Sequence, residues 1–280
     1  MSDSIMISAE DLDRLHRAEL EIMDEIHRIC MKHDISYFLD SGTALGAIRH
    51  GGFIPWDDDV DVGMLRADYE KFIKVARDEL APAFFLQTFE SERYYSKFNA
   101  KIRMNNTLFP EEASVGLGNR GISIDVFPFD YIEDEKDKAT ARIDKSRILI
   151  KAVLHTRPDF APKRLKNKLI RLLLNKKRYH IYRSKYEKCI KEVNEHPTSH
   201  VTCFIYHMIE KQYITFALED IYPIKPIRFE DRTYMIMNNP DAYLTEMYGD
   251  YMVLPPEEKR VCHAGGKIIF DLGVKMDENS

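Results

Sequence analysis

The chain has 280 residues, of which 44% are hydrophobic, and a formal net charge of −5 with a pI near 6.1. This is enough apolar sequence for one large core, or for a core with an appended helical part. The acidic balance argues against a general nucleic-acid binder, which is usually basic, so we expect no nucleic acid among its partners.

The cysteines and the chain start indicate the compartment. Four cysteines are scattered without a Cys-x-x-Cys pair, which fits a reducing compartment rather than a disulfide framework or a zinc site. The first residues lack the basic start and apolar stretch of a signal peptide. No uninterrupted apolar run approaches the roughly 20 residues needed to span a bilayer. We therefore expect a cytoplasmic protein that can also act at the inner face of the cell membrane.

Helices and strands alternate in the first half of the chain. Ser8 as N-cap and acids in the first turn predict a helix that continues at helical spacing to about Lys32. A short helix over 43–49 is expected behind a turn at Gly42, and an amphipathic helix over 67–80. Strands are expected at 35–39, 60–64, 84–89, 97–104 and 122–127.

The second half changes character twice. Residues 134 to about 195 are expected to be helical, and Lys163 to Lys191 contain twelve Lys or Arg against one acid, Glu187. That basic segment is either a solvated helix packed on the core or a surface for an anionic membrane or acceptor. Short strands at 228–229 and 234–237 and a helix at 240–248 then return to the core. We predict three parts: a catalytic core over 1–133, a basic helical insertion over 134–200, and a C-terminal segment over 201–280 that completes the active site.

Four aspartates lie within five positions at 57, 58, 59 and 61. On a strand, side chains at i and i+2 point to the same face, so Asp59 and Asp61 share one side. Carboxylates held that close repel each other, which indicates either a divalent cation between them or a proton on one of them. An EF-hand is excluded because its Gly at loop position 6 and Glu at position 12 are missing. Asp57 and Asp58 fit a solvated loop equally well.

A third acid and a helix start complete the predicted chemistry. Asp125 alternates with apolar residues, so a neighbouring strand can bring it alongside the pair, although a strand-end hydrogen bond would also explain it. The Gly42 turn opens a helix whose N–H groups and dipole favour an anion. Metal ligands beside such a phosphate site suggest phosphoryl or nucleotidyl transfer. An all-oxygen ligand set favours Mg²⁺, with Mn²⁺ as an alternative.

Further candidates surround these acids. We expect Ser41, Gly42 and Thr43 to bind the phosphates of the substrate that donates the transferred group. Thr43 could instead serve only as a helix cap. Arg49, Lys101 and Arg103 are candidates for neutralising the rest of the donor's phosphate charge. Lys101 and Arg103 alternate on one strand, so they share a face. Exposed strand charges would explain them equally well. A substrate pocket is predicted from Trp56, Asp58 and His263, with core packing as the alternative for Trp56.

The segment SGTALGAIRHGGFIPWDDDVDV, from Ser41 to Val62, resembles the hallmark of the LicD family. That family belongs to the polymerase β-like nucleotidyltransferase superfamily and is related to fukutin-related protein. Residues 121–130 resemble its third block, and residues 248–251 and 254–260 its C-terminal block. The resemblance implies an α/β (α+β) fold, with a nucleotidyltransferase-like mixed sheet, flanking helices and an appended basic helical segment. It also implies that Asp59, Asp61 and Asp125 are catalytic metal ligands, and that a histidine near position 263 approaches the site.

The same resemblance implies a function. Members of the family are metal-dependent phosphotransferases that move a phospho-alcohol, phosphocholine foremost here, from a CDP-linked donor such as CDP-choline. The acceptor is a hydroxyl of a cell-surface glycan, lipid-linked glycan or teichoic acid precursor, and CMP leaves. Three alternatives stay open: a nucleotidyltransferase that leaves the nucleoside monophosphate on its acceptor, an Asp-x-Asp glycosyltransferase that uses Mn²⁺, and a binding or regulatory protein with a dead site. The intact trio of acids argues against the third. The region before Asp59 lacks the Rossmann-like half that precedes the motif in the glycosyltransferase class.

Overall fold

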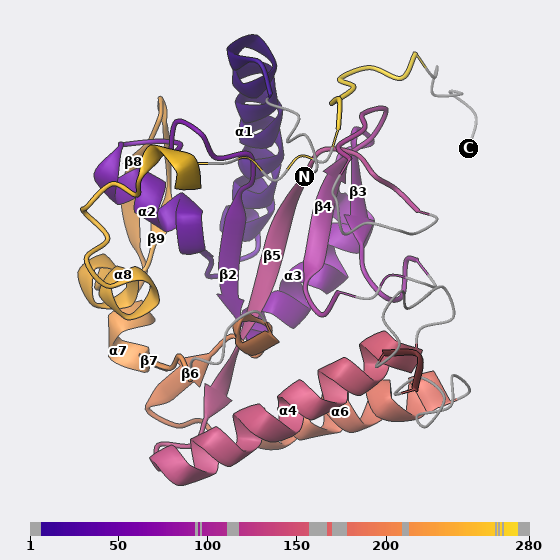
Figure 1. Ribbon diagram of the computed structural model, residues 1–280, viewed down its shortest axis with the longest axis vertical. Coiled ribbons are helices and arrows are strands. Elements are labelled where there is room, and N and C mark those ends of the chain that lie inside the picture. Colours follow the sequence, from indigo (N-terminus) through magenta and orange to yellow (C-terminus); the bar gives the residue numbers. More distant parts are fainter. Residues whose placement is uncertain are drawn as a thin grey trace.

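The computed structural model describes residues 7–92, 95, 97–110, 118–156, 167–169, 178–208, 213–260, 262, 264 and 266–273. They form a seven-stranded mixed sheet flanked by helices, with a separate two-stranded hairpin. In Figure 1, α1 (Ala9–Lys32) and α3 (Arg66–Glu79) lie behind the central strands, and α4 (Lys136–Thr156) and α6 (Tyr179–Asn194) cross the bottom. The predicted α/β (α+β) class is confirmed.

α1 begins and ends where the sequence predicts. The Ser8 side chain accepts a hydrogen bond from the backbone N–H of Asp11 (3.0 Å), which satisfies one of the N–H groups that lack a partner at a helix start. Leu15, Ile22 and Ile26 recur at helical spacing and are fully buried against the sheet. The helix therefore anchors the apolar core behind the sheet.

The central strands place the acids. β2 (Asp61–Leu65) runs parallel to β5 (Ser123–Ile132), and β5 pairs antiparallel with β4 (Ala100–Met104), which in turn pairs with β3 (Phe84–Gln87). β1 (Phe38–Leu39) closes the other edge against β2. Because side chains alternate along each strand, Asp61, Asp125 and Lys101 project from one face of the sheet. Alternating apolar residues such as Val62 and Ile124 are fully buried.

β5 is longer than predicted, because its two halves have different neighbours on one side. Its first half pairs with β4 up to Val126, and its second half pairs with β6 (His200–Thr202) from Asp130 onward. β6 continues to β7 (Phe216–Ala217), and neither short strand was predicted. Pro128 lies between the part of β5 that pairs with β4 and the part that pairs with β6. Its missing N–H therefore costs no hydrogen bond to either of these strands.

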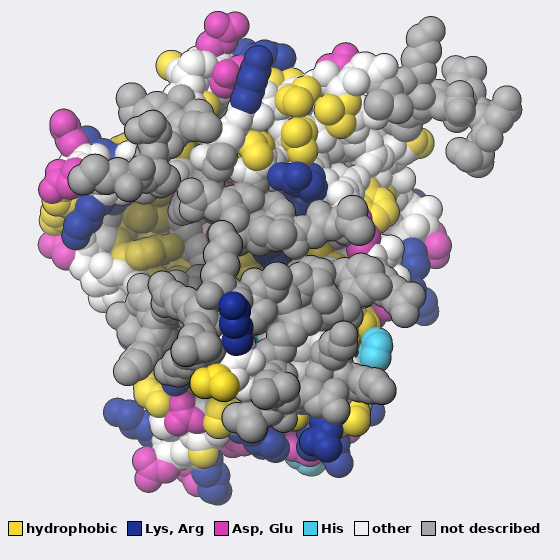
Figure 2. Space-filling view, turned by 45° about the vertical axis from the view of Figure 1, so that its right-hand side comes forward, with side chains coloured by type: hydrophobic (Ala, Val, Ile, Leu, Met, Phe, Trp, Pro, Cys, Tyr) yellow, Lys and Arg dark blue, Asp and Glu magenta, His cyan; other side chains and the backbone are white. Residues whose placement is uncertain are grey.

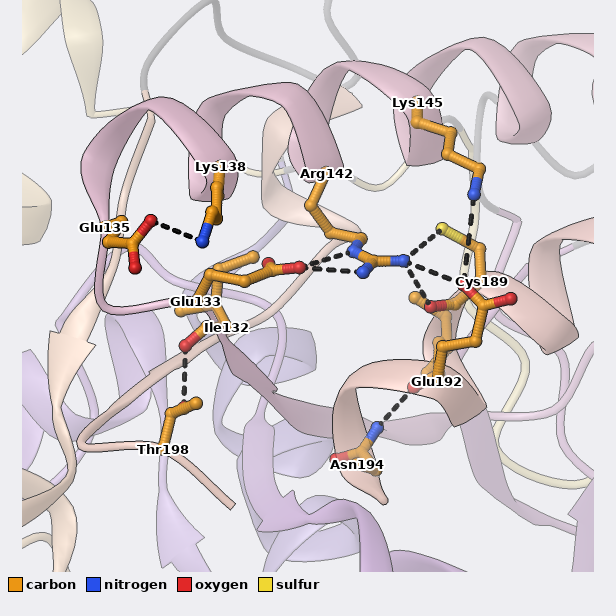
Figure 3. A network of polar contacts seen from close by, with 11 residues as sticks. Ile132, Glu133, Glu135, Lys138, Arg142, Lys145, Cys189, Glu192, Asn194 and Thr198 are labelled. Atoms are coloured by element: carbon orange, nitrogen blue, oxygen red, sulfur yellow. Dashed lines mark hydrogen bonds and ion pairs between the residues drawn. The ribbon is translucent and has the colours of Figure 1, made fainter. Parts of the chain in front are cut away.

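The helices α4 and α6 pack on each other around a small apolar cluster that includes Ile143, Ile150 and Ile190. Figure 3 shows how polar contacts join their ends: the Arg142 guanidinium donates to Glu133 Oε1 (2.7 and 3.0 Å) and to Glu192 Oε2 (3.1 Å). Acidic and basic side chains are interspersed at the lower end of the face seen in Figure 2, the level at which these helices lie. On α6, Arg183 pairs with Glu187 (2.6 Å) and Lys191 with Glu195 (4.0 Å), so acids partly compensate the basic residues of this helix.

The C-terminal segment returns to the first half of the chain. The hairpin β8 (Lys225–Phe229) and β9 (Arg232–Ile236), and α8 (Pro240–Tyr248), agree with the predicted elements. They lie beside α2 (Ser41–Arg49) at the left of Figure 1, near the short helix α7 (Leu218–Ile221). Short 3₁₀ turns occur at Tyr206–Met208 and Glu257–Lys259. No helix among the described residues is both long and apolar enough to cross a bilayer.

Candidate active site

The sheet register brings two of the predicted acids side by side. Asp61 on β2 is the direct partner of Asp125 on β5, and the Asp125 N–H donates to the Val60 carbonyl (3.1 Å). The expectation that a neighbouring strand carries Asp125 alongside Asp61 is confirmed, whereas Asp59, predicted to share a strand face with Asp61, lies outside the strand. Asp59 lies two residues before Asp61, immediately ahead of β2.

The carboxyl groups are close enough to change one another's protonation. Burial raises the pKa of Asp61 well above its ordinary range, and the charges of Asp59, Asp125 and Asp40 raise it further. Each added negative charge in this site therefore disfavours ionisation of Asp61. A cation placed among these oxygens would reverse that effect.

Asp125 has two polar neighbours, Lys101 on β4 and Asn99 just before that strand. Lys101 Nζ donates to its Oδ2 (2.6 Å) and to Ser123 Oγ (3.2 Å), and the Asn99 side-chain amide donates to its Oδ1. Lys101 is buried, so this ion pair is shielded from water. Lys101 therefore contacts a predicted ligand acid rather than lying free for a donor phosphate.

Arg103 shares the face of Lys101, as predicted, but it is also buried. Its guanidinium donates to Gln87 Oε1 (2.6 Å) and to the Gly121 carbonyl (2.6 Å). These contacts connect β3, β4 and the start of β5. They lend no support to the predicted contact between Arg103 and a donor phosphate.

The predicted phosphate-binding helix start has an unexpected conformation. Ser41, not Gly42, takes the left-handed backbone conformation (φ 46°), and helix α2 already begins there. A Cβ on Gly42 would lie 2.9 Å from Asp57 Oδ2, so a larger residue here would displace the end of the Asp57 side chain. Thr43 Oγ1 accepts from the Asp61 N–H (2.9 Å), which joins the starts of α2 and β2.

Asp40 is the site residue that sequence reasoning missed. It is fully buried, caps α2 through a hydrogen bond from the Ser41 N–H (2.7 Å), and accepts from the hydroxyl groups of Tyr206 and Tyr243. Its N–H donates to the Asp61 carbonyl (3.0 Å). Its position before the Gly42 turn offered a helix-cap signal, but the two tyrosines lie more than 160 residues away in sequence.

Burial raises the pKa of Asp40 to about 6, although the hydrogen bonds from both tyrosines oppose the shift. A folded carboxyl with a raised pKa binds a proton that the unfolded chain has lost, so stability falls as pH rises from about 4 to about 6. We expect Asp40→Asn to flatten this dependence, which urea unfolding at a series of pH values would measure. An unchanged slope would contradict the assignment of the shift to Asp40.

Arg49, Asp58 and Trp56, three further predicted residues, lie at the edge of the site. Arg49 ends α2, and eight helical steps of about 1.5 Å place it roughly 12 Å from Ser41. Asp58 is buried and accepts from the Ala264 N–H (2.7 Å), so it fixes the C-terminal segment. Trp56 is half-buried under the Arg260 guanidinium (5.0 Å to the ring centroid). His263 lies outside the described residues.

The fit of a divalent cation can be judged from the donor atoms. Asp59, Asp61 and Asp125 offer only carboxylate oxygens, the ligands that Mg²⁺ prefers. Their mutual effect on the pKa of Asp61 is the kind of repulsion that a cation would relieve. The set fits Mg²⁺ in chemistry, but no three His, Cys, Asp or Glu side chains in the described part of the chain are already arranged as a metal site.

A cavity of about 770 Å³ lies at the opposite ends of β2 and β5 from Asp61. Its wall includes Arg66 and the aromatic residues Phe89, Phe98 and Tyr186. Arg183 already occupies the faces of both phenylalanine rings (4.8 Å to each centroid). Asn99 lines this cavity and also contacts Asp125, so the cavity adjoins the acids through one side chain.

A mixed sheet whose parallel central strands place aspartates beside a helix start is typical of the nucleotidyltransferase class of transferases. A family model described as LicD/FKTN/FKRP, nucleotidyltransferase domain, matches residues 34–158. The chain is 31% identical over 253 residues to the lipopolysaccharide cholinephosphotransferase LicD of Haemophilus influenzae. The aligned region covers 87% of this chain and 92% of that protein. The chain therefore belongs to the LicD family of phosphotransferases, as its sequence predicts.

Similarity to eukaryotic members is local. The ribitol 5-phosphate transferase FKRP of human and of mouse is 53% identical over 34 residues, which is 12% of this chain and 7% of FKRP. These relatives are named for different phospho-alcohols. The bacterial and eukaryotic relatives thus share a family, but their names give different transferred groups.

Proposed function

We propose that this protein transfers phosphocholine from a CDP-linked donor to a hydroxyl of a cell-surface glycan precursor and releases CMP. The pairing of Asp61 with Asp125, with Asp59 two residues away, is the observation that carries the proposal. The name of the Haemophilus relative supports phosphocholine as the transferred group and lipopolysaccharide as the acceptor class. Teichoic acid and capsule precursors offer the same hydroxyl chemistry.

Asp59, Asp61 and Asp125 would hold Mg²⁺, or Mn²⁺ in its place. The bound ion would neutralise charge on the transferring phosphoryl group and favour ionisation of the attacking hydroxyl. Asp125 would receive the proton of that hydroxyl, and Lys101 and Asn99 orient its carboxylate for this role. Thr43 keeps Asp61 in register with the helix start, where Ser41 and Gly42 would meet the donor's phosphates.

A lipid-linked acceptor would be reached at an anionic membrane surface through residues 163–191, at the inner face of the cell membrane. In the described part of that segment, Leu169 and Ile181 are exposed apolar residues among basic ones. Apolar and basic side chains together favour the surface of an anionic bilayer. We expect flotation with anionic vesicles, and its loss when Lys185, Lys188 and Lys191 are all changed to Glu; flotation that survives these changes would contradict the proposal.

The function is tested by incubating the protein and Mg²⁺ with CDP-choline, other CDP-alcohols, CTP and UDP-sugars, together with a glycan precursor. Release of CMP with transfer of the phospho-alcohol is the expected result. Release of pyrophosphate from CTP would instead identify a nucleotidyltransferase, and UDP from a sugar donor a glycosyltransferase. Removal of the metal ion with a chelator is expected to stop the reaction.

A further inference from the structure

Two arginines that are far apart in sequence, Arg49 and Arg260, hold the same turn of the C-terminal segment. Arg49 Nη1 donates to the Tyr251 carbonyl (2.7 Å), and Arg260 Nε donates to the Pro255 carbonyl (3.0 Å). The Arg260 guanidinium also stacks on the Trp56 ring, with 5.0 Å to the ring centroid. The two side chains thus fix both ends of the turn from Tyr251 to Pro255.

The positive charges of Arg49 and Arg260 lie close enough to act on each other. Within the residues that the structure describes, no ion pair with a carboxylate involves Arg49 or Arg260. Burial and the charge of Arg260 both lower the pKa of Arg49, so the two guanidinium groups repel each other. Such a pair is unusual in a chain whose net charge is −5, where carboxylates are plentiful.

The pair lies within reach of the acids. Trp56 precedes Asp59 by three residues, so their Cα atoms are at most about 11 Å apart. Two residues that follow Arg260 contact the acidic segment: Cys262 Sγ donates to the Trp56 carbonyl (3.2 Å), and the Ala264 N–H donates to Asp58 (2.7 Å). A substrate bound at Asp59 and Asp61 can therefore extend to the arginines.

We propose that Arg49 and Arg260 form a binding site for a phosphate group, with Trp56 as its aromatic wall. Guanidinium groups present several N–H donors in a fixed plane and bind phosphate oxygens in pairs. The inference rests on the proposed function, because that reaction supplies two sources of phosphate. One is the nucleotide phosphate of the donor, and the other is a phosphate carried by the glycan acceptor.

Calorimetric titration with CMP and with inorganic pyrophosphate, in the presence of Mg²⁺, tests the site without turnover. We expect Arg260→Gln and Arg49→Gln each to weaken binding about tenfold or more, because each loses charge-assisted hydrogen bonds. Arg260→Lys should recover part of the loss, since it keeps the charge but not the planar group. Arg17→Gln is the control, because Arg17 pairs with Asp13 on the exposed face of α1.

Steady-state kinetics identify the source of the phosphate. Weaker CMP binding assigns the site to the donor, whereas unchanged CMP binding with a KM for the acceptor raised about tenfold assigns it to an acceptor phosphate. Variants that melt at a lower temperature but keep wild-type CMP and pyrophosphate affinities and acceptor KM would overturn the proposal. If no CDP-linked donor reacts but Arg260→Gln still loses pyrophosphate binding, the anion site stands and the proposed function fails.

Discussion

Asp61→Asn is expected to reduce turnover by about 10³-fold or more and to leave the fold intact. A carboxylate that holds a catalytic cation contributes several kcal/mol of transition-state stabilisation, and each 1.4 kcal/mol is a factor of ten in rate. We expect similar losses for Asp59→Asn and Asp125→Asn. CMP release under saturating CDP-choline and Mg²⁺ measures the effect.

The electrostatics of the site give this prediction a second readout. Because burial and the neighbouring carboxylates raise the pKa of Asp61, its replacement by neutral asparagine removes the cost of placing a charge there. Asp61→Asn should therefore melt at the same or a higher temperature than the wild type in the absence of metal. Asp13→Asn, in an exposed ion pair on α1, serves as the control. A variant of Asp61 that retains wild-type turnover would remove this residue from the proposed metal site.

Arg66→Met is expected to lower the free energy of unfolding by about 3–5 kcal/mol, which is the usual cost of leaving a buried charge without its partner. Arg66 makes a two-bond contact with Asp130 (2.7 and 2.8 Å), and Asn194 donates to the same carboxylate (2.7 Å). Asp130 is 1% exposed, so water cannot replace the lost contact. Urea unfolding measures the change, provided that the dependence of the free energy of unfolding on urea concentration is the same for both proteins.

A double variant distinguishes an unpaired charge from lost packing as the cause of this destabilisation. If the loss comes from the unpaired Asp130 charge, the double variant Arg66→Met with Asp130→Leu should recover much of it. Arg17→Met, which breaks an exposed pair, should leave the free energy of unfolding unchanged. A double variant as unstable as Arg66→Met alone would show that packing around the Arg66 stem is responsible instead.

Local sequence signals predicted much of this fold. The Ser8 cap, the apolar spacing of α1 and the bounds of α8 all agree with the structure, because each depends on neighbours within one element. The pairing of Asp61 with Asp125 was also predictable. Both residues alternate with buried apolar side chains, and this pattern places each of them on a strand with a defined face.

Long-range contacts set the limit of prediction. Nothing near Asp40 in the sequence identifies Tyr206 and Tyr243 as its partners, and nothing near Trp56 identifies Arg260. The burial of Lys101 depends on which strands flank β4. The full length of β5 was missed because Pro128 is usually taken to end a strand, whereas here it lies between two pairings.

The two tyrosine hydroxyls on Asp40 also determine how much of the chain a working enzyme requires. The region matched by the family model ends at residue 158, before either tyrosine. A fragment cut at that boundary would keep every predicted ligand acid but lose two hydrogen-bond donors to the Asp40 carboxylate, together with the fully buried Tyr243 beside it. We therefore expect such a fragment to hold these acids less stably than the full chain.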